Sequence, residues 1–473
     1  MTVLPRFMIS ATHKSSGKTL VSTGITAALA KRGHKVSVFK KGPDYIDPMW
    51  LQLAAGRPAY NLDFNTMSHR ELESLFALKA ENADISLIEA NKGLYDGVAI
   101  DGSNSNAALA KLLGTPVVLV VDTKGMSRGI APLLQGYVGF DTSVCIAGVI
   151  FNRTGGSRHE TKLRSAVETY TDLPVYGAIS DLAELDITER HLGLTTPREV
   201  SQLRALIDGV ARVIAQSVNL EEVLQIAKNT PDIPFPLQGR QVPTTNCRLR
   251  IGIARDDAFS FYYADDLEAF SASGAEMVPI DMIRDKQLPE IDGLFIGGGF
   301  PETHAAALAS NTTLQTSIKN ALEAGLPAYA ECGGLMYLCH SLTWQGKKHR
   351  MVGFFEADAV LHNRPQGRGY VSFQSTANAL WPLHSNESHA HEFHYASIEN
   401  LVQPTWGRDI IRGYGIDGAH DALVKANTQA GFFHLRHCTQ TPWVTDFLDF
   451  IGSIKSETTC ATVHHRVRQH KVV

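Results

Sequence analysis

The sequence predicts an α/β protein of two domains, the first built on a mostly parallel sheet covered by helices on both faces. Its 473 residues exceed what one hydrophobic core usually serves, so two domains are expected. Short apolar, β-branched runs alternate with helical patterns along most of the chain. A stretch with four prolines and no periodicity, 230–245, interrupts this alternation, and a new strand pattern restarts it at 248–254.

The composition excludes several classes of protein. With 44% hydrophobic and 19% charged residues, the chain is expected to be soluble and globular, and its net charge of -4 gives no basic footprint for nucleic acid. The six cysteines lack C-x-x-C pairing, which favours a reducing compartment over zinc sites or disulfides. Apolar runs are too short to span a membrane, and no signal peptide precedes the first motif. We therefore expect a cytoplasmic protein.

The breaks in the pattern predict the domain boundaries. An N-terminal domain is expected over 1–228, a linker over 229–246, a C-terminal domain over 247–456 and a flexible tail over 457–473.

A phosphate-binding loop is predicted at the start of the chain. An apolar run at 6–11 leads into Thr12-His-Lys-Ser-Ser-Gly-Lys-Thr19, and a helical pattern follows over 20–31. Strand before and helix after is the context that raises such a match above chance. We predict that Ser16, Gly17, Lys18 and Thr19 bind ATP, with Lys18 neutralising phosphates and the Thr19 hydroxyl binding Mg²⁺. The alternative is a Ser/Gly-rich loop with a surface lysine.

Carboxylates follow two more predicted strands. The strand at 36–39 ends in a segment containing Asp44-Tyr-Ile-Asp47, and the strand at 85–89 ends on Glu89. Open α/β sheets bind ligands at the carboxyl ends of their strands, so Thr19, Asp44 and Glu89 form a candidate Mg²⁺ site. Asp47 is predicted to position an acceptor carboxylate or its cation, with Tyr45 and Ile46 beside the substrate. Alternatively, Asp44 or Asp47 caps a helix over 48–55.

The alternation continues to the end of the first domain. Helices are expected at 104–113, 127–138 and 157–170, strands at 116–122, 144–151 and 174–179, and closing helices at 201–217 and 220–227. Asn152, expected just beyond a strand, is a candidate for reading the nucleotide base, although a turn asparagine is equally expected there. Arg190 and His191 form a candidate anion or substrate loop, with a solvated surface loop as the alternative.

The second domain carries a candidate nucleophile. An apolar strand pattern at 328–331 runs into Cys332, then Gly333-Gly334, then a helical pattern, an order that exposes a nucleophile on a tight turn. The glycine run 297–299 follows another strand and offers amides for half of an oxyanion hole. A thiol needs an imidazole partner, and His434, at the end of an apolar run, is the preferred base. A buried structural cysteine and a strand-end histidine satisfied by backbone are the alternatives.

Seven motifs together resemble one family. They are Ser16-Gly-Lys-Thr19, Lys41-Gly-Pro-Asp-Tyr-Ile-Asp-Pro48, Gly93-Leu-Tyr-Asp-Gly97, Glu189-Arg-His-Leu-Gly-Leu194, Gly297-Gly-Gly-Phe-Pro-Glu302, Ala330-Glu-Cys-Gly-Gly334 and Glu392-Phe-His-Tyr395. Residues 6–440 resemble the glutamine-dependent a,c-diamide synthases of tetrapyrrole biosynthesis. The resemblance implies an N-terminal phosphate-loop domain similar to dethiobiotin synthetase and a C-terminal domain like the class I glutamine amidotransferases.

The resemblance also implies the chemistry and the co-substrates. Cys332 would release ammonia from glutamine with His434 as general base, and the amides of Gly299 and Gly333 would hold the oxyanion. ATP with Mg²⁺ would phosphorylate the a and c acetate carboxylates of a tetrapyrrole, most simply cobyrinate, and ammonia would displace phosphate. The expected partners are these small molecules; the oligomeric state is left open, with a homodimer as one alternative.

Three departures from the family pattern bear on this interpretation. Thr12 replaces the first glycine of the phosphate loop, and Arg436 stands where most class I amidotransferases carry the acid that orients the histidine. Segments 88–93 and 101–106 differ from the cobyrinate enzymes, which keeps siroheme, sirohydrochlorin and its nickel derivative as alternative substrates. A cobyric-acid-type synthase is disfavoured by the segment 42–47. A nucleotide-switched binding protein with a vestigial glutaminase domain is the non-enzyme alternative.

Overall fold

The computed structural model describes residues 4–181, 189–190, 193–194, 203–232, 248–383 and 385–469. The chain divides into two compact units, 1–240 and 241–473, and this division lies inside the segment expected as a linker. Within the described ranges, no helix has the length and apolar character needed to cross a bilayer.

Unit 1 is built on a seven-stranded parallel sheet in the order β3-β2-β4-β1-β5-β6-β7. Its strands are β1 (Arg6–Ala11), β2 (Val36–Lys41), β3 (Ala59–Leu62), β4 (Ile85–Glu89), β5 (Val117–Asp122), β6 (Ile146–Thr154) and β7 (Val175–Ser180). The central strands are buried along their whole length, as expected where helices cover both faces.

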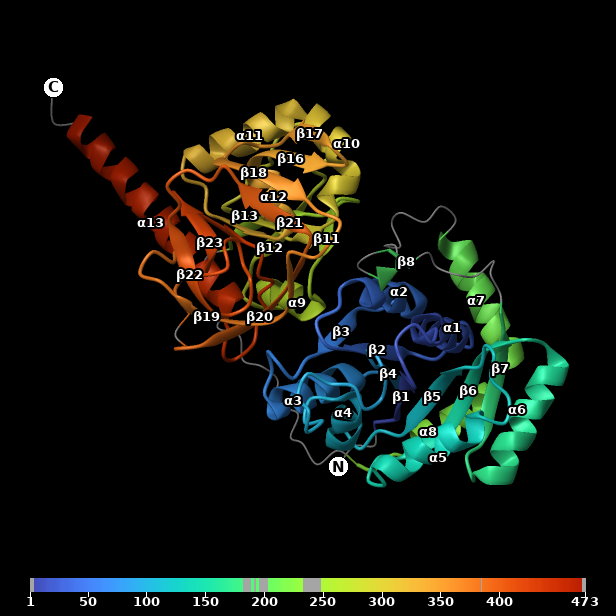
Figure 1. Ribbon diagram of the computed structural model, residues 1–473. Helices are drawn as coiled ribbons and strands as arrows, with labels where there is room; N and C mark the ends of the chain where they lie inside the picture. The colour runs from blue at the N-terminus through green and yellow to red at the C-terminus, as the bar shows by residue number, and fades with distance from the viewer. Residues whose placement is uncertain are drawn as a thin grey trace. The chain divides into compact units, whose positions relative to one another are not determined.

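Helices cover this sheet on both faces. They are α1 (Lys18–Lys31), α2 (Ile46–Ala55), α3 (His69–Ala80), α4 (Asn106–Leu112), α5 (Ile130–Phe140), α6 (Ser157–Tyr170), α7 (Leu203–Ser217) and α8 (Leu220–Lys228). Apolar residues of α1, α2, α7 and α8 share one core cluster with the central strands. In Figure 1, α1 and α7 lie along one side of the sheet, and α4 and α5 lie along the other. The parallel α/β fold predicted for this half is confirmed.

The edge strand β3 and helix α3, which follow β2 and α2, were not predicted from the sequence. A local signal for α3 was present, because Ser68 and Glu71 form a capping box at its N-terminus. A second difference concerns Asn152, which was expected beyond a strand but lies within β6, since that strand runs on to Thr154.

Unit 2 contains a nine-stranded mixed sheet in the order β12-β10-β13-β15-β24-β23-β22-β19-β20. Five strands are parallel: β10 (Arg250–Ala254), β12 (Glu276–Ile280), β13 (Gly293–Ile296), β15 (Ala328–Glu331) and β24 (Thr428–Gly431). Four antiparallel strands extend it: β19 (Gly367–Ser375), β20 (Ser388–His394), β22 (Trp406–Arg412) and β23 (His420–Lys425). The α/β class predicted for this half is confirmed, and the antiparallel strands that extend the parallel part of the sheet were not predicted.

Smaller elements complete unit 2. A four-stranded sheet contains β16 (Cys339–Trp344), β17 (Lys347–Arg350), β18 (Phe355–Leu361) and β21 (Ala396–Glu399), and β11 (Phe259–Phe261) pairs with β14 (Gly298–Gly299). The helices are α9 (Ala264–Ala272), a 3-10 turn (Pro301–His304), α10 (Ala305–Ser310), α11 (Thr312–Glu323), α12 (Gly333–Leu338) and α13 (Trp443–Gln469).

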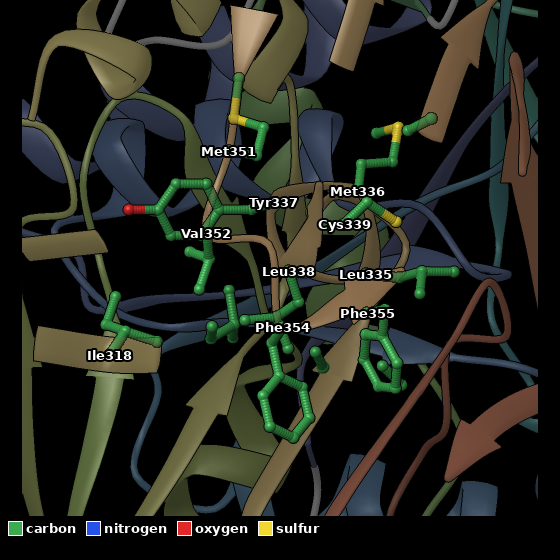
Figure 2. Packing of buried hydrophobic residues seen from close by; sticks show 14 of the residues in the cluster. Ile318, Leu335, Met336, Tyr337, Leu338, Cys339, Met351, Val352, Phe354 and Phe355 are labelled. Carbon is green, nitrogen blue, oxygen red and sulfur yellow. The ribbon is translucent and has the colours of Figure 1, made fainter. Parts of the chain in front are cut away.

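Helix α12 is buried on all sides. Its apolar residues lie among Ile318 of α11 and the segment that contains Val352, Phe354 and Phe355 (Figure 2). A helix of six residues with so little polar surface is held by tertiary packing rather than by its own propensity. The packing fixes the position of Cys332 at its N-terminus.

The ends of the units differ in detail from the predicted boundaries. The Arg6 guanidinium, at the start of β1, donates to the carbonyl of Pro231 at 2.8 Å and to the Thr230 hydroxyl at 3.1 Å, so the first residues of the expected linker belong to unit 1. At the other end, α13 continues to Gln469, and the flexibility expected of 457–473 stays a prediction.

Candidate functional sites

The phosphate loop lies between β1 and α1, as predicted. Gly17 has a φ of 83°, and a Cβ added there would lie 2.1 Å from the Asn152 amide nitrogen, so only glycine fits. The same Asn152 nitrogen donates to the Ser16 carbonyl at 3.0 Å, and the Ser16 hydroxyl donates to the carbonyl of His13 at 2.8 Å. These contacts hold the loop in shape. They place Asn152 against the loop backbone, and its reading of a base stays a prediction.

The structure explains why threonine is tolerated at position 12. Positive φ angles occur at Ser15 and Gly17 but not at Thr12, so the backbone there does not require glycine. The Thr12 carbonyl accepts a hydrogen bond from the Tyr137 hydroxyl of α5 and closely approaches Gly93. The loop is therefore anchored from a neighbouring helix rather than by a glycine turn.

Lys40 lies at the centre of the predicted carboxylates. Its ammonium group is 2.5 Å from Asp47 Oδ2, 2.8 Å from Glu89 Oε1 and 3.9 Å from Asp44 Oδ2. The Thr19 hydroxyl donates to Glu89 Oε1 at 2.7 Å. The fold thus brings Thr19, Asp44, Asp47 and Glu89 together, with a buried cation among them that the sequence analysis had not singled out.

These groups shift one another's proton affinities. Burial alone would lower the pKa of Lys40, but Asp47, Glu89 and Asp44 raise it above its ordinary value, so the ammonium stays charged. Burial would raise the pKa of Asp47, but Lys40 holds it below its ordinary value. Burial and the nearby Asp47 raise the pKa of Asp44 to about 7, against the pull of Lys40. Burial also raises the pKa of Glu89.

Lys18 is buried beside this cluster, at the start of α1. Burial and the nearby Lys40 lower the pKa of Lys18 to about 8, although Glu89 and Asp47 oppose the shift. A phosphate anion bound next to Lys18 would supply an opposite charge and would stabilise the protonated ammonium.

The loop before α2 serves two purposes. Asp44 Oδ1 accepts from the backbone amides of Ile46 and Asp47 at 2.9 and 3.1 Å, so Asp44 satisfies two amides in the first turn of α2, although the N-cap position itself is Tyr45. Its second oxygen faces Lys40. Asn61 of β3 fixes the loop by donating to the carbonyls of Gly42 and Asp44. Tyr45 and Ile46 are both buried at the start of α2.

The candidate anion loop is described only in part. Arg190 lies in β8 (Glu189–Arg190), which pairs with β9 (Gly193–Leu194), whereas His191 lies outside the described residues. β9 packs beside α2, the helix that carries Asp47, and Figure 1 shows β8 next to it.

Mg²⁺ fits the residues around Glu89 in one particular way. Among the described residues, no cluster of three or more His, Cys, Asp or Glu forms a metal cage. Glu89 Oε2 is buried and has no hydrogen-bond partner among the described residues. The Thr19 hydroxyl donates to the other oxygen of the same carboxylate. This suits an ion held mainly by phosphate oxygens and water, with one or two oxygens from the protein.

In unit 2, Cys332 occupies the sharp turn that was predicted. Its φ of 48° and ψ of -99° are unusual for a residue with a side chain, and α12 begins at the next residue. Such strain persists because the Cys332 amide donates to the Gly431 carbonyl at 2.7 Å and α12 is buried.

Glycines bring the two predicted oxyanion donors together. A Cβ added at Gly333 would lie 3.2 Å from the Gly299 nitrogen, and one added at Gly299 would lie 2.0 Å from the carbonyl oxygen of Ala258. A Cβ at Gly298 would lie 2.6 Å from the His434 ring. Only glycines allow β14, the cysteine turn and the histidine to approach so closely.

His434 is brought to the cysteine by the end of β24. Its backbone pairs with His391 of β20, and the two imidazole rings stack with centroids 4.9 Å apart. Burial alone would lower the pKa of His434, but hydrogen bonds with Cys332 and Glu331 raise it to about 10. His434 Nδ1 lies 3.3 Å from Glu331 Oε2, which leaves Nε2 as the ring nitrogen for the thiol. The geometry suits proton transfer between sulfur and imidazole.

Three residues of these sites were not identified from the sequence: Lys40, Glu331 and His391. Lys40 and Glu331 each lie in a buried strand, at or next to its carboxyl end, where a charged residue needs a partner. That signal was present in the sequence. His391 opens one of the two histidine-bearing segments considered for the base, but its stacking on His434 could not be predicted, since the two residues are 43 positions apart in the sequence.

Comparisons with known proteins agree with the division into two domains. Residues 7–194 match the model of the CobQ/CobB/MinD/ParA nucleotide binding domain, and residues 250–441 match that of the CobB/CobQ-like glutamine amidotransferase domain. The chain is similar to the protein named cobyrinate a,c-diamide synthase from Magnetococcus marinus, with 41% identity over 94% of this chain and 96% of the relative. Proteins of the same name from Archaeoglobus fulgidus and Dehalococcoides mccartyi are 36% and 37% identical over 91% and 94% of this chain, and over 94% and 97% of their own lengths.

Proposed function

The chain belongs to the cobyrinate a,c-diamide synthase family, and we propose that it uses ATP and glutamine to convert the a and c acetate groups of cobyrinate into amides. The observation that carries this proposal is the presence, on one chain, of a thiol–imidazole pair in unit 2 and of a phosphate loop beside buried carboxylates in unit 1. The first makes ammonia, and the second makes a carboxylate reactive toward it.

In unit 2, the Cys332 thiol passes its proton to His434, and the thiolate attacks the side-chain carbonyl carbon of glutamine. The amides of Gly299 and Gly333 are placed to hold the oxyanion. His434 returns the proton to the nitrogen, the C–N bond breaks, and ammonia leaves. Water then hydrolyses the thioester, which gives glutamate and restores the thiol.

In unit 1, an acetate oxygen of the macrocycle attacks the terminal phosphorus of ATP, and ADP leaves. Lys18 and the loop amides neutralise the phosphates, and Lys40 keeps Asp47 ionised near the acceptor. Mg²⁺, which Thr19 and Glu89 would help to hold, supplies further charge neutralisation when bound. Ammonia attacks the carbonyl carbon of the acyl phosphate, phosphate leaves with the C–O bond, and loss of a proton leaves the amide. The second acetate repeats the sequence.

The roles of the two units are tested separately. Cys332→Ala should lose amidation supported by glutamine and retain amidation supported by added ammonia, whereas Lys18→Ala should lose both. Loss of both activities in Cys332→Ala would contradict separate roles for the units. A glutaminase assay also tests the binding-protein alternative, because a nucleotide switch with a vestigial domain should not release glutamate.

The acceptor is tested by parallel assays of three macrocycles. Cobyrinate, sirohydrochlorin and siroheme are incubated in parallel with the protein, ATP, Mg²⁺ and glutamine, and amides are counted from the product masses. Two amides on cobyrinate and none on the other two macrocycles is the expected result. Preferential amidation of either other macrocycle would reassign the substrate while leaving the reaction unchanged.

A further inference from the structure

We propose that Glu331, the residue directly before the nucleophile, positions the imidazole of His434 and replaces the acid that class I amidotransferases usually carry after that histidine. The proposal rests on the function proposed above, because it assigns Glu331 to the glutaminase half-reaction. Glu331 does not touch the substrate; it acts through His434.

Both carboxylate oxygens of Glu331 are directed at the segment that carries the base. Oε1 accepts from the backbone amide of Leu435 at 2.9 Å, and Oε2 lies 3.3 Å from His434 Nδ1. The Tyr329 hydroxyl, two residues earlier on the same face of β15, also hydrogen bonds to Glu331. Tyr329 therefore fixes the Glu331 carboxylate, which in turn contacts both the Leu435 amide and the His434 ring.

This contact selects the useful tautomer of His434. An ionised carboxylate only accepts hydrogen bonds, so it requires the proton of a neutral imidazole to lie on Nδ1. Nε2 then carries the lone pair that takes the proton from Cys332. When His434 becomes protonated, the same carboxylate stabilises the imidazolium. Since Glu331 and Cys332 are consecutive, one strand end fixes both the nucleophile and the partner of its base.

The usual position of the acid is closed to this role. Arg436, two residues after His434, is buried and forms an ion pair with Asp265 at 2.9 Å, and its guanidinium lies over the Tyr263 ring at 4.8 Å. A fixed cation at this position cannot accept the histidine proton. Tyr263 in turn lies 3.3 Å from Nδ1 of His391, whose ring stacks on His434.

His391 supplies a second, uncharged restraint. It is buried, and its pKa is lowered well below the ordinary value by burial and by the nearby His434 and Arg436. The neutral His391 ring is stacked on the face of the His434 imidazole, so it limits rotation of that imidazole away from its contact with Glu331. The edge contact with Glu331 and the face contact with His391 together fix both ring angles.

The test compares Glu331→Gln and Glu331→Asp with the wild type in the full-length protein. Gln keeps the size and can still accept from Leu435, but it has no charge, and its amide group tolerates the wrong tautomer. We expect kcat for glutamine hydrolysis to fall ~10–100-fold with KM nearly unchanged, as for loss of one charge-assisted hydrogen bond. Asp should retain part of the activity, and amidation supported by ammonia should remain.

A second readout reports on the thiol itself. The rate of alkylation of Cys332 by iodoacetamide, followed by peptide mass spectrometry, is measured as a function of pH. In Glu331→Gln, the midpoint of that profile should move to higher pH, because the imidazolium that accompanies the thiolate is less stable. Asp292→Asn is the matched control, since this carboxylate accepts from the Arg250 amide at the other end of the parallel strands.

The outcomes separate this proposal from the proposed function. If the wild type does not hydrolyse glutamine, the proposed function fails. If the wild type is active and Glu331→Gln retains kcat within about twofold with an unchanged alkylation profile, the positioning role is overturned. Thermal unfolding identifies a variant that does not fold; Glu331→Asp then carries the test, and wild-type kcat in that variant would overturn the proposal.

Discussion

Removal of the Lys40 ammonium tests the central electrostatic feature of unit 1. Lys40→Met keeps the approximate shape of the side chain and deletes a buried charge that lies 2.5 Å from Asp47 and 2.8 Å from Glu89. Three carboxylates would then lose the ammonium that lies among them, and only Lys18, beside the cluster, would remain as a nearby cation. The variant should be destabilised, and it should lose ATP-dependent amidation while retaining glutamine hydrolysis in unit 2.

The expected size of the effect follows from the geometry. With an effective dielectric constant of ~20, unit charges at these separations attract by roughly 6 kcal/mol each, and desolvation of the ions cancels much of that gain. Removal of one partner from a buried ion pair typically costs ~3–5 kcal/mol. For a domain of this size, that loss lowers Tm by about 6–20 °C.

The pH dependence gives the sign of the interaction. In the wild type, Lys40 holds the pKa of Asp47 below its unfolded value, so this contribution to stability is present at neutral pH and is lost on acidification. In Lys40→Met, the carboxylates should have folded pKa values above their unfolded values. The folded state then binds more protons, and the variant should regain stability as the pH falls from 8 to about 5.

The control variant is Lys41→Met. The assay is differential scanning calorimetry of Lys40→Met, Lys41→Met and the wild type. Lys41 is also buried, but burial lowers its pKa to about 8, and its ammonium donates to the Asn104 carbonyl. Its replacement removes an unfavourable buried charge and should change stability little. The reasoning is refuted if the free energy of unfolding of Lys40→Met lies within about 1 kcal/mol of that of the wild type, or if Lys41→Met lowers it as much as Lys40→Met does.

Three further predictions concern both units. Because the pKa of Lys18 is about 8 in the free protein, the Kd for ATP should rise above pH 8, and ATP binding there should take up a proton. Lys18→Arg should make the Kd less dependent on pH. Calorimetry in buffers of different ionisation enthalpy measures the Kd and the proton uptake. Gly299→Ala places a Cβ against a backbone carbonyl and should lower glutamine hydrolysis ~100–1,000-fold, whereas Gly452→Ala, which meets nothing within 4 Å, should not. Arg436→Met should cost ~3–5 kcal/mol in urea unfolding by stranding Asp265, and the double variant with Asp265→Leu should recover most of it; a double variant no better than the single one would contradict the ion pair.

Local patterns were sufficient where neighbours in the sequence are neighbours in space. The phosphate loop and the cysteine turn each consist of a strand, a few turn residues and a helix, so residue order predicts their geometry. The antiparallel half of unit 2 could not be predicted in the same way. Strands β19, β20, β22 and β23 read as short, weakly periodic runs, and their pairing depends on contacts distant in sequence.

The sequence by itself determined the two-part α/β design and the phosphate loop, and it predicted Cys332 and His434 as nucleophile and base, because these follow from periodicity and from short motifs. Only the tertiary structure decided which charges meet. Lys40 became the centre of the carboxylate cluster because β2 lies next to β4 and Glu89, and Glu331 became the partner of His434 because β15 lies next to β24. The physical reason is that buried charges select partners across the sheet, and sheet neighbours are set by the fold rather than by order in the chain.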